Sequence, residues 1–157
     1  MNSIEENILL DIITDVSKSF LENDMSIEVN EVTNSEDSNI NKYYALVSFD
    51  GDMNIFCIVS IDEELLNHIL KAFLPHQMSD EEKDEMICKL PDEIVNTVAG
   101  LSIARFPKKY ENLVMSVPLA LDKKEIETLE INYASASKKI KTMYGYFVCS
   151  VIKVKIK

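Results

Sequence analysis

Long apolar runs are missing from this 157-residue sequence, and none approaches the roughly 18 consecutive apolar residues that span a bilayer. The first residues also lack the basic and apolar regions of a secretory signal. Positive charge is scarce, with 16 Lys and Arg against 27 Asp and Glu and a net charge of −11. Phosphate backbones and anionic lipid surfaces would repel such a chain. We therefore expect a cytoplasmic protein that binds neither nucleic acid nor membrane.

Patterns for metal binding and nucleophilic catalysis are equally scarce. Cys57, Cys88 and Cys149 lie far apart in apolar surroundings without a CxxC pair, which favours buried thiols in a reducing compartment. Neither His68 nor His76 has a second ligand at metal-binding spacing, so surface roles are favoured for both. We expect no metal site in this chain.

What remains is an ordinary globular composition. Hydrophobic residues make up 46% of the chain and charged residues 27%, which is enough apolar material for one core. The length suits one folding unit. We expect residues 1–157 to form a single domain.

Apolar residues at helical spacing predict helices in the first half of the chain. A capping box at Ser3 begins a helix that runs to about Leu21. Ser60 has the spacing of a second cap, for a short helix that ends before Pro75. One side of this short helix carries the apolar residues Leu65, Leu66, Ile69, Leu70 and Phe73.

A third and longer helix is predicted from Ser79, which begins another capping pattern, to about Arg105. Pro91 interrupts it. Proline removes a backbone donor and crowds the carbonyl four residues earlier, so we expect either a kink or a fresh helix that starts at Pro91.

Several β-rich segments complete the predicted elements. Asp50-Gly51-Asp52 separates two of them and predicts a hairpin. Alternating residues at the C-terminus predict a sheet that is covered on one side, with lysines on its solvent face. The predicted strands are 26–32, 43–49, 53–61, 113–121, 126–133 and 140–156, with a loop at 34–41.

The segment 92–100 carries the most informative pattern. At about 100° per residue, a helix places Glu93, Asn96 and Gly100 within one narrow arc. The opposite arc would pack on a sheet through the apolar residues Ile94, Val98 and Leu101. A carboxylate and a carboxamide would then face solvent one turn apart, beside a glycine that lets another backbone approach.

The four-residue spacing has little weight alone, because Glu-x-x-Asn also begins at Glu31, Glu36 and Glu64. Exposed Glu and Asn on a helix are most often plain solvated residues. Only the copy at Glu93 combines a following glycine with an opposing apolar stripe.

With these residues the chain resembles the chemotaxis phosphatases CheX and CheC, which share a fold with the flagellar-switch proteins FliM and FliY. Glu93, Asn96 and Gly100 match the family pattern of Glu-x-x-Asn followed by glycine. The order of helices, the Val117-Pro118 step and the Gly145-x-Phe147 strand also follow CheX, and a single motif resembles CheX more than CheC. The resemblance implies an α/β layered fold, with two long helices and a short helix on a mainly antiparallel sheet.

The resemblance also implies an activity, the hydrolysis of phospho-aspartate on a CheY-type response regulator. The regulator would supply the phosphoryl group and Mg²⁺, so no cofactor is expected in this chain. Asn96 would orient the attacking water, and Glu93 would pair with the active-site lysine of the regulator. Asp92 and Gly100 would contact the partner, although Asp92 stands where the family commonly has glycine.

Two alternative functions remain open, and we also expect a particular oligomeric state. Asp92 and the single motif leave room for a non-catalytic module of the same fold that binds a regulator or a signalling complex. A flagellar-switch component is the second alternative, although no extra domain or binding tail is visible. We also expect a CheX-like homodimer joined through sheet edges, because the long apolar strands near the C-terminus would leave an edge to protect.

Overall fold

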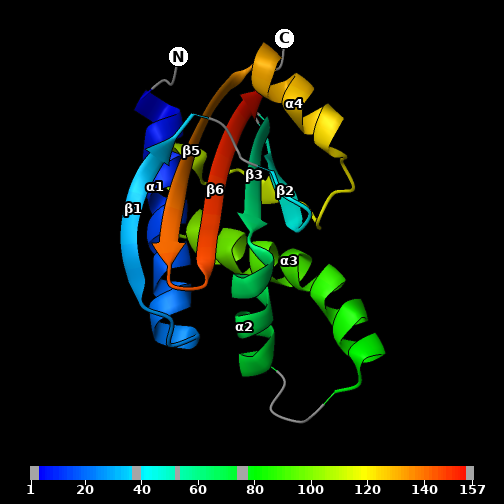
Figure 1. Cartoon of the computed structure of the whole chain (residues 1–157). Helices are drawn as coiled ribbons and strands as arrows, with labels where there is room; N and C mark the ends of the chain where they lie inside the picture. The colour runs from blue at the N-terminus through cyan, green and yellow to red at the C-terminus, as the bar shows by residue number, and fades with distance from the viewer. Residues whose placement is uncertain (1–3, 37–39, 52–53, 74–77, 155–157) are drawn as a thin grey trace.

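The computed structural model describes residues 4–36, 40–51, 54–73 and 78–154, which form one sheet with helices on both faces (Figure 1). The described strands stand in the order β1-β5-β6-β3-β2-β4, and all their pairings are antiparallel. They are β1 (Val29–Ser35), β2 (Tyr44–Asp50), β3 (Asn54–Ile61), β4 (Val114–Met115), β5 (Ala134–Thr142) and β6 (Gly145–Val154). The helical segments are α1 (Ile4–Ser19), η1 (Phe20–Asp24), α2 (Glu63–Phe73), α3 (Asp80–Ile103), η2 (Lys108–Tyr110) and α4 (Lys123–Asn132).

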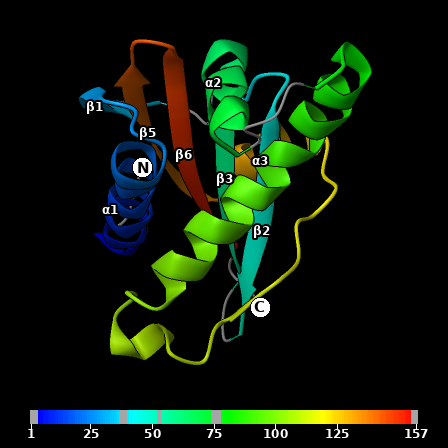
Figure 2. The same cartoon turned by 90° about the horizontal axis from the view of Figure 1, so that it is seen from below.

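Alternate strand residues point into two separate apolar clusters. Val47 and Cys57 belong to the main core, which α1 and α3 cover from one face of the sheet (Figure 2). Leu46 and Ile58 point the other way, into a smaller cluster closed by Ile126 of α4. The predicted packing of the two long helices on one face is confirmed. The prediction that the sheet is covered on one side only is wrong.

The N-terminal helix is found where it was predicted. Leu9, Ile13 and Val16 face the core at helical spacing, and the helix continues through a π turn, η1, to Asp24. The predicted cap at Ser3 lies outside the described residues.

The predicted hairpin of β2 and β3 is confirmed, with Asp50 opposite Asn54 next to the turn. The prediction that Ser60 caps the next helix is wrong. Ser60 is the penultimate residue of β3, where its hydroxyl accepts a hydrogen bond from the Asn41 N–H at 3.0 Å. The helix α2 begins after Asp62 instead, and Phe73 at its end is exposed.

The long helix α3 begins as predicted, because the Ser79 hydroxyl accepts a hydrogen bond from the Glu82 N–H. It runs unbroken across Pro91, so no fresh helix starts there. Residues 79–86 are all exposed, and Ile87 is the first buried residue. In Figure 1 this first part of α3 extends away from the sheet at the lower right.

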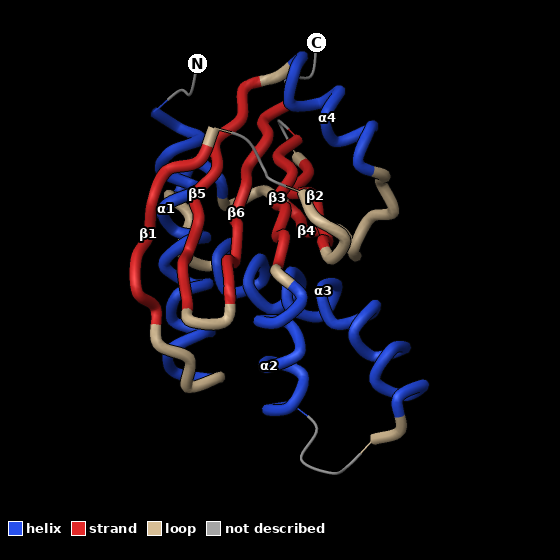
Figure 3. Tube along the Cα trace, viewed as in Figure 1, coloured by secondary structure: helices blue, strands red, loops and turns tan. Residues whose placement is uncertain are grey.

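The segment between α3 and β5 differs most from the predictions. Only β4 forms within the predicted strand 113–121, and the predicted strand 126–133 is helix α4 (Figure 3). Asp122 and Glu125 explain the helix, because each side chain accepts a hydrogen bond from the other residue's backbone N–H. This reciprocal cap fixes the first turn and carries Ile126 into the second cluster.

The predicted C-terminal strand 140–156 is wrong over its described part, which belongs to two strands joined by a turn at residues 143–144, and its last two residues lie outside the described residues. Gly145 begins β6 directly after this turn, and its φ is +120°. A side chain there would lie 2.7 Å from the Asp62 carboxylate, so glycine is required. Strand β1 starts later than predicted and extends into the predicted loop. It pairs with β5, and β6 lies between β5 and β3. The expectation that the C-terminal strands leave an open edge is therefore wrong.

Candidate functional site

Glu93 and Asn96 lie one turn apart on the solvent side of α3, so the prediction of their exposure is confirmed. The same stretch is anchored from beneath. Ile94 is 1% exposed and Val98 is 0% exposed, both in the core cluster that joins α3 to the sheet. The carboxylate and the carboxamide therefore project from a helical segment whose opposite face is fully packed.

Leu101 does not belong to this buried face, because 54% of its surface is exposed. Ser102 is buried instead, and its hydroxyl donates to the Val98 carbonyl at 2.6 Å. This hydrogen bond satisfies the hydroxyl, which is the only polar group of the Ser102 side chain, so a serine can occupy a core position. The predicted Ile94/Val98/Leu101 stripe is wrong at its last member, and Leu101 adds apolar surface on the side of α3 that carries Thr97.

Gly100 has open space above it. A side chain there would meet only the Cε atom of Met115, at 3.9 Å, an ordinary contact distance. Among the described glycines only Gly145 has a positive φ, so the backbone at Gly100 does not demand glycine either. Neither packing nor backbone geometry requires glycine here, and the gap beside Met115 is available to a partner. The sequence carried no signal for Met115, since it comes from a different element.

Asp92 is exposed and directly precedes Glu93. Partial burial raises the pKa of the Asp92 carboxyl, and the neighbouring Glu93 carboxylate raises it further. The Thr97 hydroxyl donates its hydrogen to the Glu93 carbonyl at 3.0 Å, so that hydrogen is already used within the helix. Asp92, Glu93 and Asn96 thus form the polar part of the site, and Gly100 continues it.

A similar pattern occurs on α2 and differs in decisive details. Glu63, Glu64 and Asn67 match the spacing of the α3 residues, but Lys71 stands where α3 has Gly100. In this copy the Tyr43 hydroxyl donates to a Glu63 carboxylate oxygen at 2.9 Å. A long cationic side chain at the glycine position leaves no comparable gap for a partner backbone.

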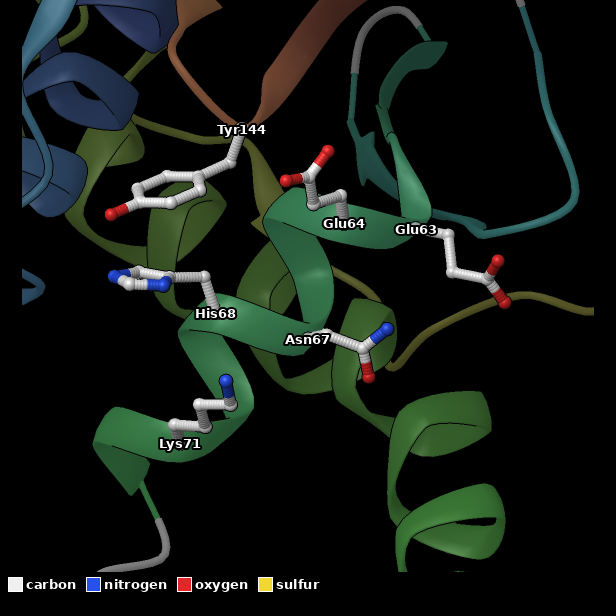
Figure 4. Close-up of a pocket in the computed structure, with 6 residues that line it drawn as sticks. All are labelled: Glu63, Glu64, Asn67, His68, Lys71 and Tyr144. Atoms are coloured by element: carbon white, nitrogen blue, oxygen red, sulfur yellow. The ribbon is translucent and has the colours of Figure 1, made fainter.

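The α2 residues line a surface hollow of about 310 Å³ together with Tyr144 of the turn between β5 and β6 (Figure 4). The rings of His68 and Tyr144 stack there, with centroids 3.8 Å apart and planes 17° apart. His68 is thus engaged in packing at the surface.

The cysteines divide into two groups. Cys57 and Cys149 are fully buried in the sheet, and burial raises the pKa of both thiols, that of Cys149 to about 12. Cys88 lies exposed on α3, so the prediction that all three are buried is wrong. In the described part of the chain, no three His, Cys, Asp or Glu side chains group as metal ligands. Nor is any helix there long and apolar enough to cross a membrane.

In the comparison with protein families, the model described as chemotaxis phosphatase CheX matches residues 43–142. This range contains α2, α3 and the whole candidate site. No sequence among the curated proteins matches the chain.

Solved structures match the fold over nearly the whole chain, at low sequence identity. A CheC-like superfamily protein from Shewanella sp. PV-4 has a TM-score of 0.72 and 15% identity, covering 97% of this chain and 99% of its own. CheX in the CheX–CheY–BeF3–Mg complex from Borrelia burgdorferi has a TM-score of 0.66 and 16% identity, covering 94% and 98%. FliY from Thermotoga maritima has a TM-score of 0.52 and 13% identity, covering 98% and 92%. The expected fold class is confirmed.

Proposed function

Because the chain belongs to the CheX family of chemotaxis phosphatases, we propose that it hydrolyses the phospho-aspartate of a CheY-type response regulator. One observation carries the proposal. Glu93 and Asn96 project side by side from the packed half of α3, next to the open position at Gly100. The family match and the Borrelia burgdorferi complex, in which a structurally similar CheX binds CheY, support this choice of partner.

Asn96 orients the water that attacks the phosphorus atom. A carboxamide accepts hydrogen bonds through its oxygen and donates them through its nitrogen, and it does not titrate near neutral pH. Hydrolysis of an acyl phosphate depends mainly on placing the nucleophile in line with the leaving oxygen. An exposed carboxamide on a rigid helix can hold a water in that place.

Glu93 pairs with the active-site lysine of the regulator. A carboxylate would repel the phosphoryl oxygens, but it forms a charge-assisted hydrogen bond with an ammonium group. This contact fixes the docked position before reaction. Asp92 and Gly100 complete the surface that meets the regulator, Gly100 by admitting its backbone.

The regulator supplies both the phosphoryl group and Mg²⁺, so this chain needs no cofactor of its own. The proposal treats residues 1–157 as one domain that acts in the cytoplasm, where response regulators work. It also includes a homodimer joined through a sheet edge, for which β1 is the long end strand.

The alternative is a module of the same fold that binds a regulator without hydrolysing its phosphate. Asp92 favours it, because the family commonly has glycine there and an added negative charge next to Glu93 changes how a partner docks.

The deciding experiment follows dephosphorylation of CheY-type regulators from the same cell at increasing concentrations of this protein. Asn96→Ala should leave regulator binding largely intact and lower the rate by a factor of roughly 100 or more, because water orientation acts in the transition state. Glu93→Ala should weaken both binding and rate.

One control variant and two possible results complete the experiment. Asn67→Ala removes the corresponding carboxamide of α2 and should change neither quantity. Binding without acceleration by the unaltered protein would favour the non-catalytic module. An active Asn96→Ala variant would show that the site lies elsewhere.

A further inference from the structure

We propose that Met115 and Leu101 form an apolar part of the surface that binds the regulator, an inference that rests on the proposed function. Both side chains adjoin Gly100, at the end of the polar residues of α3. An apolar side chain of the regulator, close to its phospho-aspartate, packs on them. Met115 and Leu101 set how tightly the regulator binds, whereas Asn96 acts on the reaction itself.

The pairing of β4 with β2 places Met115 beside α3. Met115 lies opposite Phe49, and directly opposed residues of an antiparallel pair point to the same face of the sheet. Phe49 is fully buried in the main core, which α3 covers on that face. Ser116 holds the strand in place, because its N–H donates to the Ser48 carbonyl and its hydroxyl accepts from the Ser48 N–H. Met115 therefore points toward α3 from a fixed backbone.

The end of the Met115 side chain lies at the border of the candidate site. Its Cε atom is 3.9 Å from the place where a side chain at Gly100 would begin. Gly100 is one turn beyond Asn96, about 6 Å along the helix axis. Glycine has no side chain to cover the methionine here, and Met115 is only half-buried. A regulator backbone that enters the gap at Gly100 must therefore touch Met115.

Leu101 enlarges this apolar surface. It follows Gly100 directly in α3 and is exposed, because Ser102 takes the core position next to it. Leu101 also lies one turn beyond Thr97, on the side of the helix that carries Glu93. Two apolar side chains from separate elements thus adjoin the same glycine.

The polar residues of the site need apolar neighbours to hold a partner. The ion pair between Glu93 and the regulator lysine forms at an exposed position, where such pairs add little affinity. The water held by Asn96 matters mainly in the transition state. Specific interfaces cover about 800 Å² of each partner and take most of their binding energy from a few well-packed contacts near the centre. A patch of this size around Asn96 is roughly 30 Å across, so it includes both Met115 and Leu101.

Polar replacements test the binding role. Met115→Gln keeps the length of the side chain and removes its apolar end. It should raise the protein concentration for half-maximal dephosphorylation about three- to tenfold and leave the maximal rate unchanged. Met115→Leu should behave like the unaltered protein, because leucine preserves the apolar contact.

Two further variants make the test independent of folding. Met115 also packs against the core, whereas Leu101 is exposed, so Leu101→Gln should raise the half-saturating concentration without disturbing the fold. Met143→Gln is the matched control, since Met143 is exposed in the turn between β5 and β6, and it should change neither quantity.

A binding measurement separates this inference from the proposed activity. The probe is a CheY-type regulator from the same cell, loaded with Mg²⁺ and beryllofluoride, a stable mimic of the phosphoryl group. The methyl signal of Met115 in a carbon–proton NMR spectrum, identified by its loss in Met115→Leu, should shift when this regulator is added. The methyl signal of Met143 should not shift.

The possible results distinguish the two proposals. Half-saturating concentrations that stay unchanged in Met115→Gln and Leu101→Gln would overturn the inference alone, as would an equal effect of Met143→Gln or a loss of maximal rate only. Regulator binding without a shift of the Met115 signal would also overturn it. A shifted signal without any hydrolysis would support the inference while the proposed activity fails. If the unaltered protein binds no such regulator, both are overturned.

Discussion

At the scale of a single residue, Gly100 allows stability and the proposed function to be tested separately. Its backbone is helical, and a methyl group there would only touch Met115. Gly100→Ala should therefore raise the free energy of unfolding by up to about 1 kcal/mol, because alanine is the better helix former. The same substitution should lower the dephosphorylation rate if a regulator backbone enters the gap. Denaturant unfolding and the dephosphorylation assay measure the two effects.

Gly145 provides the matched comparison. Gly145→Ala places a methyl group against Asp62 in a backbone conformation that favours glycine, so it should lower the free energy of unfolding by about 1–3 kcal/mol. If Gly100→Ala proves both destabilising and fully active, the glycine has a structural role and the partner gap is refuted.

The residue pattern predicted the exposure of Glu93 and Asn96 better than it predicted the packing around them. Glu93 and Asn96 could be placed because helical periodicity depends only on sequence spacing. Leu101 could not, since Ser102 takes the core position by satisfying its own hydroxyl on the Val98 carbonyl. The contact of Met115 with the Gly100 position joins separate elements, and periodicity contains no information about it.

At the scale of the element, the helix α4 shows how a local cap overrides residue preference. Isoleucine, threonine and tyrosine in 126–133 favour a strand, yet the reciprocal cap of Asp122 and Glu125 starts a helix. The pattern was present in the sequence and competed with the β-rich composition. The hairpin at Gly145 was missed for a similar reason, because one long apolar run concealed a turn.

Asp122→Ala should lower the free energy of unfolding by about 1 kcal/mol, the usual cost of losing an N-cap side chain. Asp122→Asn should cost much less, since asparagine caps almost equally well. Chemical denaturation of both variants measures the difference. Equal losses in the two variants would mean that charge, not the cap, stabilises α4.

For the whole molecule, the two edges of the sheet are unequal. At the β2 edge, the chain after β4 continues alongside and hydrogen-bonds through Ser116 and Leu119 to β2 carbonyls. At the other edge, β5 is the one strand among the described residues that pairs with β1. An end strand of seven residues leaves backbone donors and acceptors that a second chain can pair.

We therefore expect a dimer at tens of micromolar, measured by light scattering coupled to size-exclusion chromatography. Val32→Lys places a charge in the middle of β1, at an exposed position, and should shift the population to monomer. Val117→Lys at the opposite side of the sheet, also exposed, should leave the dimer intact. If the unaltered protein is monomeric at this concentration, the expected dimer is contradicted.

The uneven burial along α3 has a consequence for motion. Its first two turns, with every side chain exposed, depend on the Ser79 cap and on acidic residues near the helix N-terminus. The later turns open only if core residues such as Val95 and Val98 lose their packing. Amide hydrogens should therefore exchange with solvent quickly at the start of the helix and slowly around Asn96. One helix would thus combine a readily fraying beginning with a candidate site that stays ordered.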